Sequence, residues 1–137
     1  MTCMKSVDEE LIRARAQFRC EYCHLPQAGH DERFSIDHVI PRKHGGHDAD
    51  TNLALACLRY NLRKGTNLSG VDELSGQVVE LFNPRLQKWD EHFAWKLEVL
   101  TGLTPAGRAS VLVKNMNAPE RLLLRRTLIG EGILNPH

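Results

Sequence analysis

Residues 34–66 read FSIDHVIPRKHGGHDADTNLALACLRYNLRKGT, and this stretch brings the chain's potential metal ligands and proton-transfer groups closest together. Phe34 and Ile36 alternate with polar neighbours, which is the pattern of a half-buried strand. We expect that strand to end at Pro41, because proline cannot donate a ladder hydrogen bond. The polar positions of this strand are therefore the first candidates for a functional site.

A helix is predicted to follow the strand. The Gly-Gly pair at residues 45–46 indicates a turn, and Thr51 or Asn52 is a suitable N-cap. LALACLRYNLRK, residues 53–64, consists of good helix formers with basic residues at its end, and Gly65 is a stop signal. The expected order is thus strand, loop and helix, the order of a ββα unit.

Before this stretch, apolar residues recur at helical spacing: Val7, Leu11, Ala14 and Phe18. They predict an N-terminal helix with these side chains on one face. The helix leads into CEYCH, residues 20–24, which we expect to form a tight knuckle. In an intracellular chain, a C-x-x-C pair such as Cys20 and Cys23 favours metal ligation or redox chemistry over a disulfide framework.

After residue 66, the pattern predicts strands at 78–82 and 93–100 and helices at about 104–114 and 117–129. Thr104-Pro105 is typical of a helix start, and Asn117 with Glu120 resembles a capping box. Three aromatic residues fall among apolar neighbours, and we expect them in the core rather than as base-stacking platforms: Trp89, Phe93 and Trp95. The predicted fold class is α+β.

Length and composition are those of one globular domain, residues 1–137, with a core motif at 20–66 and an extension at 67–137. Apolar residues make up 42% of the chain, but no apolar run approaches the roughly 20 residues of a membrane span. The first residues become acidic and amphipathic where a signal peptide would be apolar. We therefore expect a cytoplasmic protein with no membrane association.

The net charge of +1 hides an uneven distribution. Residues 34–66 carry five Lys and Arg against three Asp, and residues 104–137 carry five against two acids. Residues 67–103, in contrast, carry three basic residues against six acidic ones. This unevenness is weak support for a nucleic-acid-binding face.

Four polar residues are suited to divide the work of phosphodiester cleavage, which requires a water nucleophile, a base and positive charge. Asp37 and His38 are neighbours on a strand and so point in different directions, one toward a metal and the other toward a water. Asn52 precedes the predicted helix and Asn61 lies within it, nine positions later. This spacing gives them opposite helical phases and hence different tasks.

These residues resemble the HNH (ββα-metal) nuclease family. The resemblance covers Cys20 to Gly65 and rests on the C-x-x-C, Asp37-His38, Ile40-Pro41, the Gly-Gly pair, Asn52-Leu53, Cys57, Asn61 and Lys64-Gly65. With asparagine in the last position, the motif looks like the H-N-N variant. The later stretch LFNPR...W...HF...GLTPAGR resembles small bacterial and phage members.

The resemblance implies a treble-clef-like ββα-metal core, with the N-terminal helix and the C-terminal strands and helices attached to it. It also implies that His38 is the general base and that Asp37 and Asn61 bind one divalent cation, Mg²⁺ or Mn²⁺. Asn52 would brace the loop that holds His38. The implied activity is metal-dependent endonucleolytic cleavage of DNA.

Many family members hold a structural zinc with two C-x-x-C pairs, but here Tyr60 stands where the fourth cysteine is expected. Cys20, Cys23 and Cys57 leave tetrahedral zinc one ligand short. His24, His30 or His47 would complete the site in one alternative. In the other, zinc is lost and the cysteines remain as small buried residues.

Basic residues around the motif are candidates for contacts with the DNA backbone: Arg42, Lys43, Arg59, Arg63 and Lys64. His44 and His47 are expected to be solvated. The last predicted helix carries a second group, Arg121, Arg125 and Arg126, for which a phosphate patch and an exposed helix face are equally good explanations. The rival to the nuclease is a non-cleaving nucleic-acid-binding module on the same fold.

Overall fold

The computed structural model describes residues 6–57 and 67–136. Its N-terminal part is organised by an antiparallel hairpin of strand β1 (Ser35–His38) and strand β2 (Leu53–Ala56). Ser35 pairs with Ala56 and His38 pairs with Leu53. Two short 3₁₀ turns, η1 (Arg42–His44) and η2 (Asp50–Asn52), shape the loop between the strands. The strand predicted around Ile36 is confirmed.

The helix predicted to begin at Leu53 is wrong for residues 53–56, which form β2. All four residues of β2 are buried, and their backbone groups find partners on both edges. One edge pairs with β1, while on the other the Arg15 guanidinium donates to the Leu53 carbonyl at 2.7 Å and the Leu55 N–H donates to Glu21 at 2.8 Å. These long-range contacts override the helical propensity of LALA. The remainder of the predicted helix, residues 58–64, lies outside the described residues.

Helix α1 (Ser6–Arg15) packs against β2, but not through the predicted face. Leu11 is 65% exposed and Phe18, which lies beyond the helix with φ 55°, is 52% exposed. Ile12 and Ala16, four residues apart, are buried instead. The predicted helix is therefore confirmed, and its predicted apolar face is wrong.

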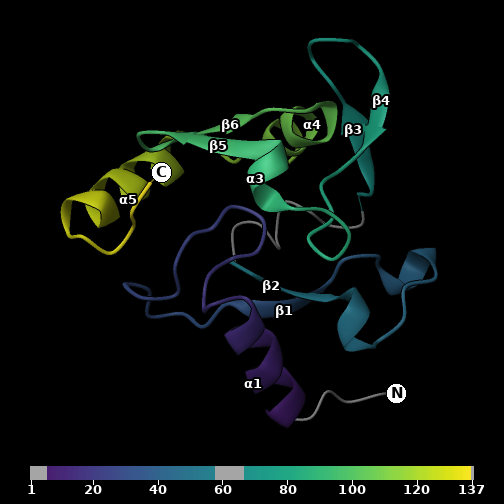
Figure 1. Ribbon diagram of the computed structural model, residues 1–137, viewed down its shortest axis with the longest axis horizontal. Coiled ribbons are helices and arrows are strands. Elements are labelled where there is room, and N and C mark those ends of the chain that lie inside the picture. Colours follow the sequence, from purple (N-terminus) through teal and green to yellow (C-terminus); the bar gives the residue numbers. More distant parts are fainter. Residues whose placement is uncertain (1–5, 58–66, 137) are drawn as a thin grey trace.

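The C-terminal part contains two further hairpins and three helices (Figure 1). Its elements are β3 (Ser69–Val71), β4 (Val78–Glu80), α3 (Trp89–His92), β5 (Phe93–Lys96), β6 (Val99–Gly102), α4 (Pro105–Val113) and α5 (Pro119–Gly130). Each hairpin is antiparallel, so the α+β class is confirmed. The single strand predicted over 93–100 is in fact a hairpin, which turns at Leu97 with φ 54°.

The two C-terminal helices test the predicted caps. The Thr104 hydroxyl accepts from the Gly107 N–H at 3.1 Å, so the predicted start of α4 is confirmed. The capping box is wrong, because α5 has Ala118 at its N-cap and no side-chain cap. Asn117 instead pairs with β6, where its side chain accepts from the Leu100 N–H and donates to the Leu100 carbonyl at 2.9 and 2.7 Å. A tertiary pairing has replaced a local one.

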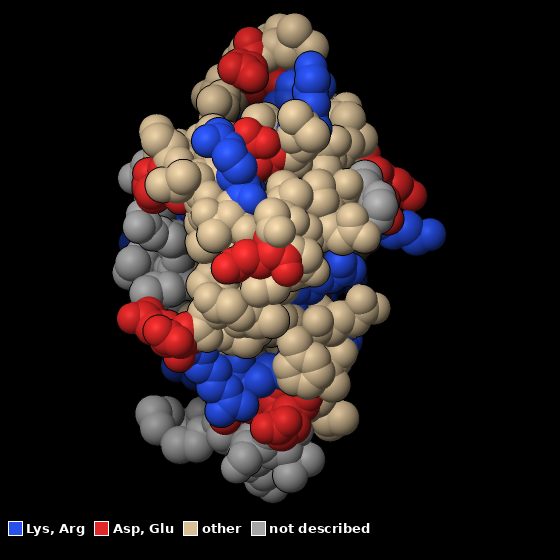
Figure 2. All heavy atoms as spheres, turned by 90° about the vertical axis from the view of Figure 1, so that its left-hand side faces the viewer, with Lys and Arg blue, Asp and Glu red and all other residues tan. Residues whose placement is uncertain are grey.

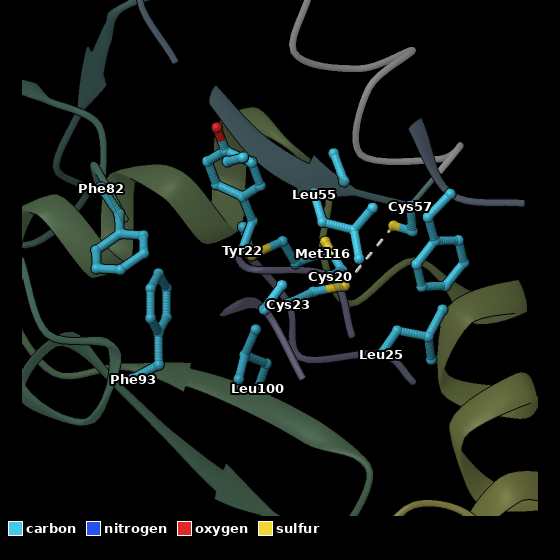
Figure 3. Packing of buried hydrophobic residues seen from close by; sticks show 14 of the residues in the cluster. Cys20, Tyr22, Cys23, Leu25, Leu55, Cys57, Phe82, Phe93, Leu100 and Met116 are labelled. Atoms are coloured by element: carbon cyan, nitrogen blue, oxygen red, sulfur yellow. Dashed lines mark hydrogen bonds between the residues drawn. The ribbon is translucent and has the colours of Figure 1, made fainter. Parts of the chain in front are cut away.

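One buried cluster joins the motif to the extension. Figure 3 shows Tyr22, Leu55 and the cysteines beside Phe82, Phe93, Leu100 and Met116. Phe93 is buried, and the half-buried Trp89 and Trp95 pack against the cluster, so their predicted place in the core is confirmed. Within residues 6–57 and 67–136, no helix has the length and apolarity to span a bilayer.

The buried Asp72 ties the β3–β4 turn to α4. Arg108 donates to its two carboxylate oxygens at 2.7 and 3.1 Å, and the Ser75 hydroxyl donates at 2.8 Å. The hydrogen bonds from Arg108, supported by those from Ser75 and Leu74, hold the pKa of Asp72 well below its usual range even though burial opposes the shift. The ionised carboxylate is thus the form that the fold stabilises.

Replacing Asp72→Asn is expected to lower the midpoint of thermal unfolding at neutral pH. Because the folded pKa is depressed, this stabilisation is complete above the unfolded pKa of about 3.9 and is lost as pH falls through the folded value. The difference in midpoint between wild type and variant, followed by circular dichroism, should therefore narrow from about pH 5 to about pH 2. The exposed neighbour Glu73→Gln is the control. A difference that stays constant over this range would contradict the assignment.

Candidate active site and cysteine cluster

Asp37 and His38 lie at the end of β1, where the hairpin opens into its loop. Asp37 is opposite Ala54 in the ladder, and its carboxylate accepts from the buried Tyr22 hydroxyl at 3.4 Å. Adjacent strand positions send their side chains to opposite faces of the hairpin. The strand therefore fixes two acid–base groups close together with different orientations.

His38 is linked to a carboxylate that the sequence did not single out. The Nε2 atom of His38 lies 2.8 Å from Oδ1 of Asp48, and Arg42 Nε donates to the same oxygen at 2.7 Å. The His38 and Asp48 side chains are 25% and 28% exposed, so water can reach the pair. Nothing in the spacing of HDADTN distinguishes Asp48 from Asp50, which is why only the folded loop identifies the residue.

The Asn52 side chain holds the loop closed on β1. Its Oδ1 accepts from the Ile40 N–H at 2.9 Å, and its Nδ2 donates to the Ile40 and His47 carbonyls at 3.0 and 2.8 Å. Asn52 is 5% exposed, so these bonds are shielded from water. Gly46 allows the close approach, because a Cβ there would lie 1.7 Å from the Ile40 carbonyl oxygen. The described geometry fixes the backbone that follows His38.

The other residues of the predicted site fall into two groups. Arg42 and Lys43 lie in the exposed turn η1, and His44 and His47 are exposed in the same loop. Asn61, Arg59, Arg63, Lys64 and Tyr60 lie outside the described residues. The placement of Asn52 before a helix is wrong, since it precedes β2, and the argument from opposite helical phases does not apply.

Cys20, Cys23 and Cys57 converge in the core (Figure 3). All three are buried, and their sulfur atoms lie within 4.8 Å of one another. The Cys23 and Cys57 sulfurs are 3.8 Å apart, which equals the edge of about 3.8 Å that a tetrahedron with 2.3 Å Zn–S bonds requires. The donor set thus fits three corners of a thiophilic metal site.

No histidine or carboxylate among the described residues joins this group. His24 stacks on Trp89 with ring centroids 3.8 Å apart, and His30 packs edge-on against Phe34. His47 is exposed in the β1–β2 loop. The prediction that one of these three histidines completes the site is therefore wrong for the arrangement seen here.

Cys20 and Cys23 differ in acidity. Hydrogen bonds from Cys20 and Cys57 lower the pKa of Cys23 well below its usual value, and Arg125 and Arg121 add to that effect. Burial raises the pKa of Cys20, and the neighbouring thiols raise it further. Burial opposes the shift at Cys23, and Cys23 is the more acidic of these two thiols.

The arginines of α5 contradict both alternatives drawn from the sequence. Arg125 is 1% exposed and Arg121 is 7% exposed, so neither lies on a solvated face or in a surface phosphate patch. Only Arg126 is exposed, and it donates to Glu98 at 3.0 Å. The apolar side of α5 is completed by buried guanidinium groups, which periodicity alone does not reveal.

The extension, residues 67–137, contacts the cysteine knuckle, residues 20–24, through polar as well as apolar side chains. Arg85 forms a salt bridge with Glu21, and the Trp89 indole donates to the Tyr22 carbonyl at 2.8 Å. The His24 ring lies on the same indole at an interplanar angle of 13°. Residues far beyond the motif thus hold the turn that carries two of the cysteines.

The match to a known family includes the residues of the candidate site and the three cysteines. Residues 20–67 match the family model described as HNH endonuclease. We call these matched residues the HNH segment. The HNH segment is roughly a third of the chain, and residues 68–137 fall outside the match. No curated protein and no solved structure gave a significant match. The H-N-N variant and the bacterial or phage type stay predictions.

The side of the molecule opposite the β1–β2 loop carries charges of both signs. On the face that Figure 2 shows, basic and acidic side chains are interspersed among uncharged ones. This is the left-hand side of Figure 1, whereas the β1–β2 loop lies on the right. The weak charge argument from the sequence gains no support on this face.

Replacing Trp89→Ala is expected to lower the free energy of unfolding by about 3 kcal/mol, because it removes a large side chain packed on the core. It also removes the hydrogen bond to Tyr22 and the stacking on His24. Urea unfolding followed by circular dichroism measures the change. Leu86→Ala, at a side chain that is 82% exposed, is expected to change it by less than about 0.5 kcal/mol. Equal effects of the two variants would contradict the bracing role of Trp89.

Proposed function

We propose that the protein is an endonuclease that hydrolyses DNA phosphodiester bonds with the help of one divalent cation. The observation that carries the proposal is the His38–Asp48 pair at 2.8 Å, next to Asp37, within a segment that matches the HNH family. An imidazole held by a carboxylate beside a second, separately oriented carboxylate suits base catalysis next to a metal.

In the proposed reaction His38 takes a proton from the attacking water. An acceptor at Nε2 favours the tautomer in which Nε2 carries the proton, since Asp48 then receives an N–H hydrogen bond. The lone pair of that tautomer is on Nδ1, which serves as the proton acceptor. The Asp48 carboxylate also stabilises the imidazolium that results.

Asp37 and Asn61 are the proposed ligands of the cation. Carboxylate and amide oxygens are hard donors and suit Mg²⁺ or Mn²⁺. When bound, the cation would stabilise the negative charge that develops on the phosphate and the leaving oxygen. For Asp37, the Tyr22 hydroxyl at 3.4 Å orients the carboxylate. The assignment of Asn61 rests on the family motif, because its position is outside the described residues.

The loop residues supply the proposed contacts with the DNA backbone. Arg42 and Lys43 stand in η1, four and five positions after His38, and both are exposed. Arg42 also bonds Asp48, so a phosphate drawn to this turn would lie close to the catalytic pair. Arg59, Arg63 and Lys64 are proposed contacts from the sequence alone. We further propose that residues 1–137 form a single domain and that the protein is cytoplasmic.

Replacing His38→Ala is expected to reduce the rate of plasmid nicking by at least about 100-fold, because the proposed general base is removed. Supercoiled plasmid is incubated with the full chain and Mg²⁺, Mn²⁺ or EDTA, and nicked and linear products are separated on a gel. His44→Ala, in the same loop, is the matched control and should retain activity. An unchanged rate in His38→Ala would refute the assignment. Gel-shift binding of wild type without nicking in either metal would favour a non-cleaving binding module.

Replacing Asp48→Ala is expected to lower kcat by about 10-fold or more with a smaller change in KM, because Asp48 orients His38 without contacting substrate. Asp48→Asn keeps an oxygen acceptor for Nε2 and should retain more activity than Asp48→Ala. Asp50→Ala is the control, since Asp50 is exposed in the same loop. Steady-state cleavage of a fluorescent duplex gives both constants. If Asp48→Ala and Asp50→Ala behave alike, the orienting role fails.

A further inference from the structure

Two buried guanidinium groups of α5 have no acidic partner. Arg121 and Arg125 are 7% and 1% exposed, and no carboxylate of residues 6–57 or 67–136 lies within ion-pairing distance of either. Buried charges in proteins are normally paired or bound to metals, because their removal from water is strongly unfavourable. These two cations therefore call for a counter-charge.

The hydrogen-bond partners of Arg125 are neutral and do not supply this counter-charge. Arg125 donates to the Glu98 carbonyl and to Asn117 Oδ1 at 3.1 and 3.0 Å, and also to the Met116 carbonyl. All three acceptors are neutral, and the Trp95 ring, whose centroid lies 5.4 Å from the Arg125 guanidinium, offers only a cation–π contact, so no negative charge balances this cation. Arg121 is less satisfied still, since neither of its terminal nitrogens has a hydrogen-bond partner.

Thiols face the same small cavity as these guanidinium groups. A cavity of about 60 Å³ is lined by Cys23, Cys57, Arg121 and Arg125, with Leu25, Leu124 and Glu120 completing its wall. Cys20 belongs to the same sulfur cluster. Glu120 lies on the exposed side of this wall, so the buried groups beside the cavity that are able to become anions are the cysteines.

The sulfur geometry indicates how those anions are held. The 3.8 Å separation of the Cys23 and Cys57 sulfurs matches the edge of a zinc–thiolate tetrahedron. The cavity beside them has room for a solvent molecule as a fourth ligand. A Zn²⁺ ion with three thiolates carries a charge of −1, or −2 with an anionic fourth ligand, and so needs cations around it.

We propose that Arg121 and Arg125 are the outer partners of a three-thiolate zinc centre formed by Cys20, Cys23 and Cys57. With zinc bound, the terminal nitrogens of Arg121 would donate hydrogen bonds to the thiolates, and Arg125 would supply the second positive charge. The metal centre thereby ties α5, at the end of the extension, to the HNH segment. The balancing charge would come from a helix that begins more than 60 residues downstream of Cys57.

Zinc affinity tests the proposal without reference to cleavage. The full chain is stripped of metal, reconstituted with Zn²⁺ alone, and titrated against a chromogenic chelator, with zinc content measured by elemental analysis. Wild type is expected to bind one zinc per chain, and Cys23→Ser is expected to bind it far more weakly. Arg121→Met is expected to weaken binding about 10- to 100-fold, the usual effect of losing an outer-shell partner. Arg126→Met, on the exposed side of the same helix, should bind like wild type.

Thermal unfolding separates this role from general packing. Without zinc, Arg121→Met removes an uncompensated buried cation and is expected to melt no lower than wild type. With saturating zinc, the rise in its melting temperature should be smaller than in wild type. Arg121→Lys keeps the positive charge, so the zinc-induced rise in its melting temperature should lie between those of Arg121→Met and wild type. The proposal is overturned if wild type binds no zinc, or if zinc raises the melting temperatures of Arg121→Met and wild type equally.

Discussion

The pairing of β1 with β2 is the constraint on which the other features depend. β2 is buried on all four positions, so each of its backbone groups needs a partner inside the protein. β1 satisfies one edge, and the Arg15 and Glu21 side chains satisfy groups on the other. Because Glu21 is itself paired with Arg85, the extension is connected to the hairpin by two consecutive polar contacts. Asp37 and His38 owe their fixed positions to this hairpin.

The loop between β1 and β2 contributes the remaining residues of the candidate site. Asn52 clamps its ends through three hydrogen bonds, and Gly46 admits the backbone contact that the clamp requires. The closed loop carries Asp48 back to His38. A carboxylate ten residues away in sequence thus becomes the partner of the proposed base. Loops held on a rigid hairpin are common positions for such groups, since the scaffold limits their motion.

The extension contributes more than apolar packing to the HNH segment. Trp89 covers the knuckle from one side, with its indole bonded to the Tyr22 carbonyl and stacked on His24. Arg121 and Arg125 of α5 line a small cavity together with Cys23 and Cys57. Tyr60 stands where the sequence motif leads one to expect a fourth cysteine, and residues of the extension pack in the same buried cluster as the other three. The length of the chain beyond the motif is consistent with this bracing role.

Four features could be predicted from the amino-acid order, because each is carried by residues close together in the chain: the resemblance of residues 20–67 to the HNH family, the strand with Asp37-His38, the start of α4 and the C-x-x-C knuckle. The folded chain was needed to show that residues 53–56 form a strand, that Asn117 pairs with β6 and that Arg125 is buried. It also selected Asp48 from two equivalent aspartates. In each case the deciding partner is distant in sequence, and local propensity and periodicity carry no information about burial by such partners.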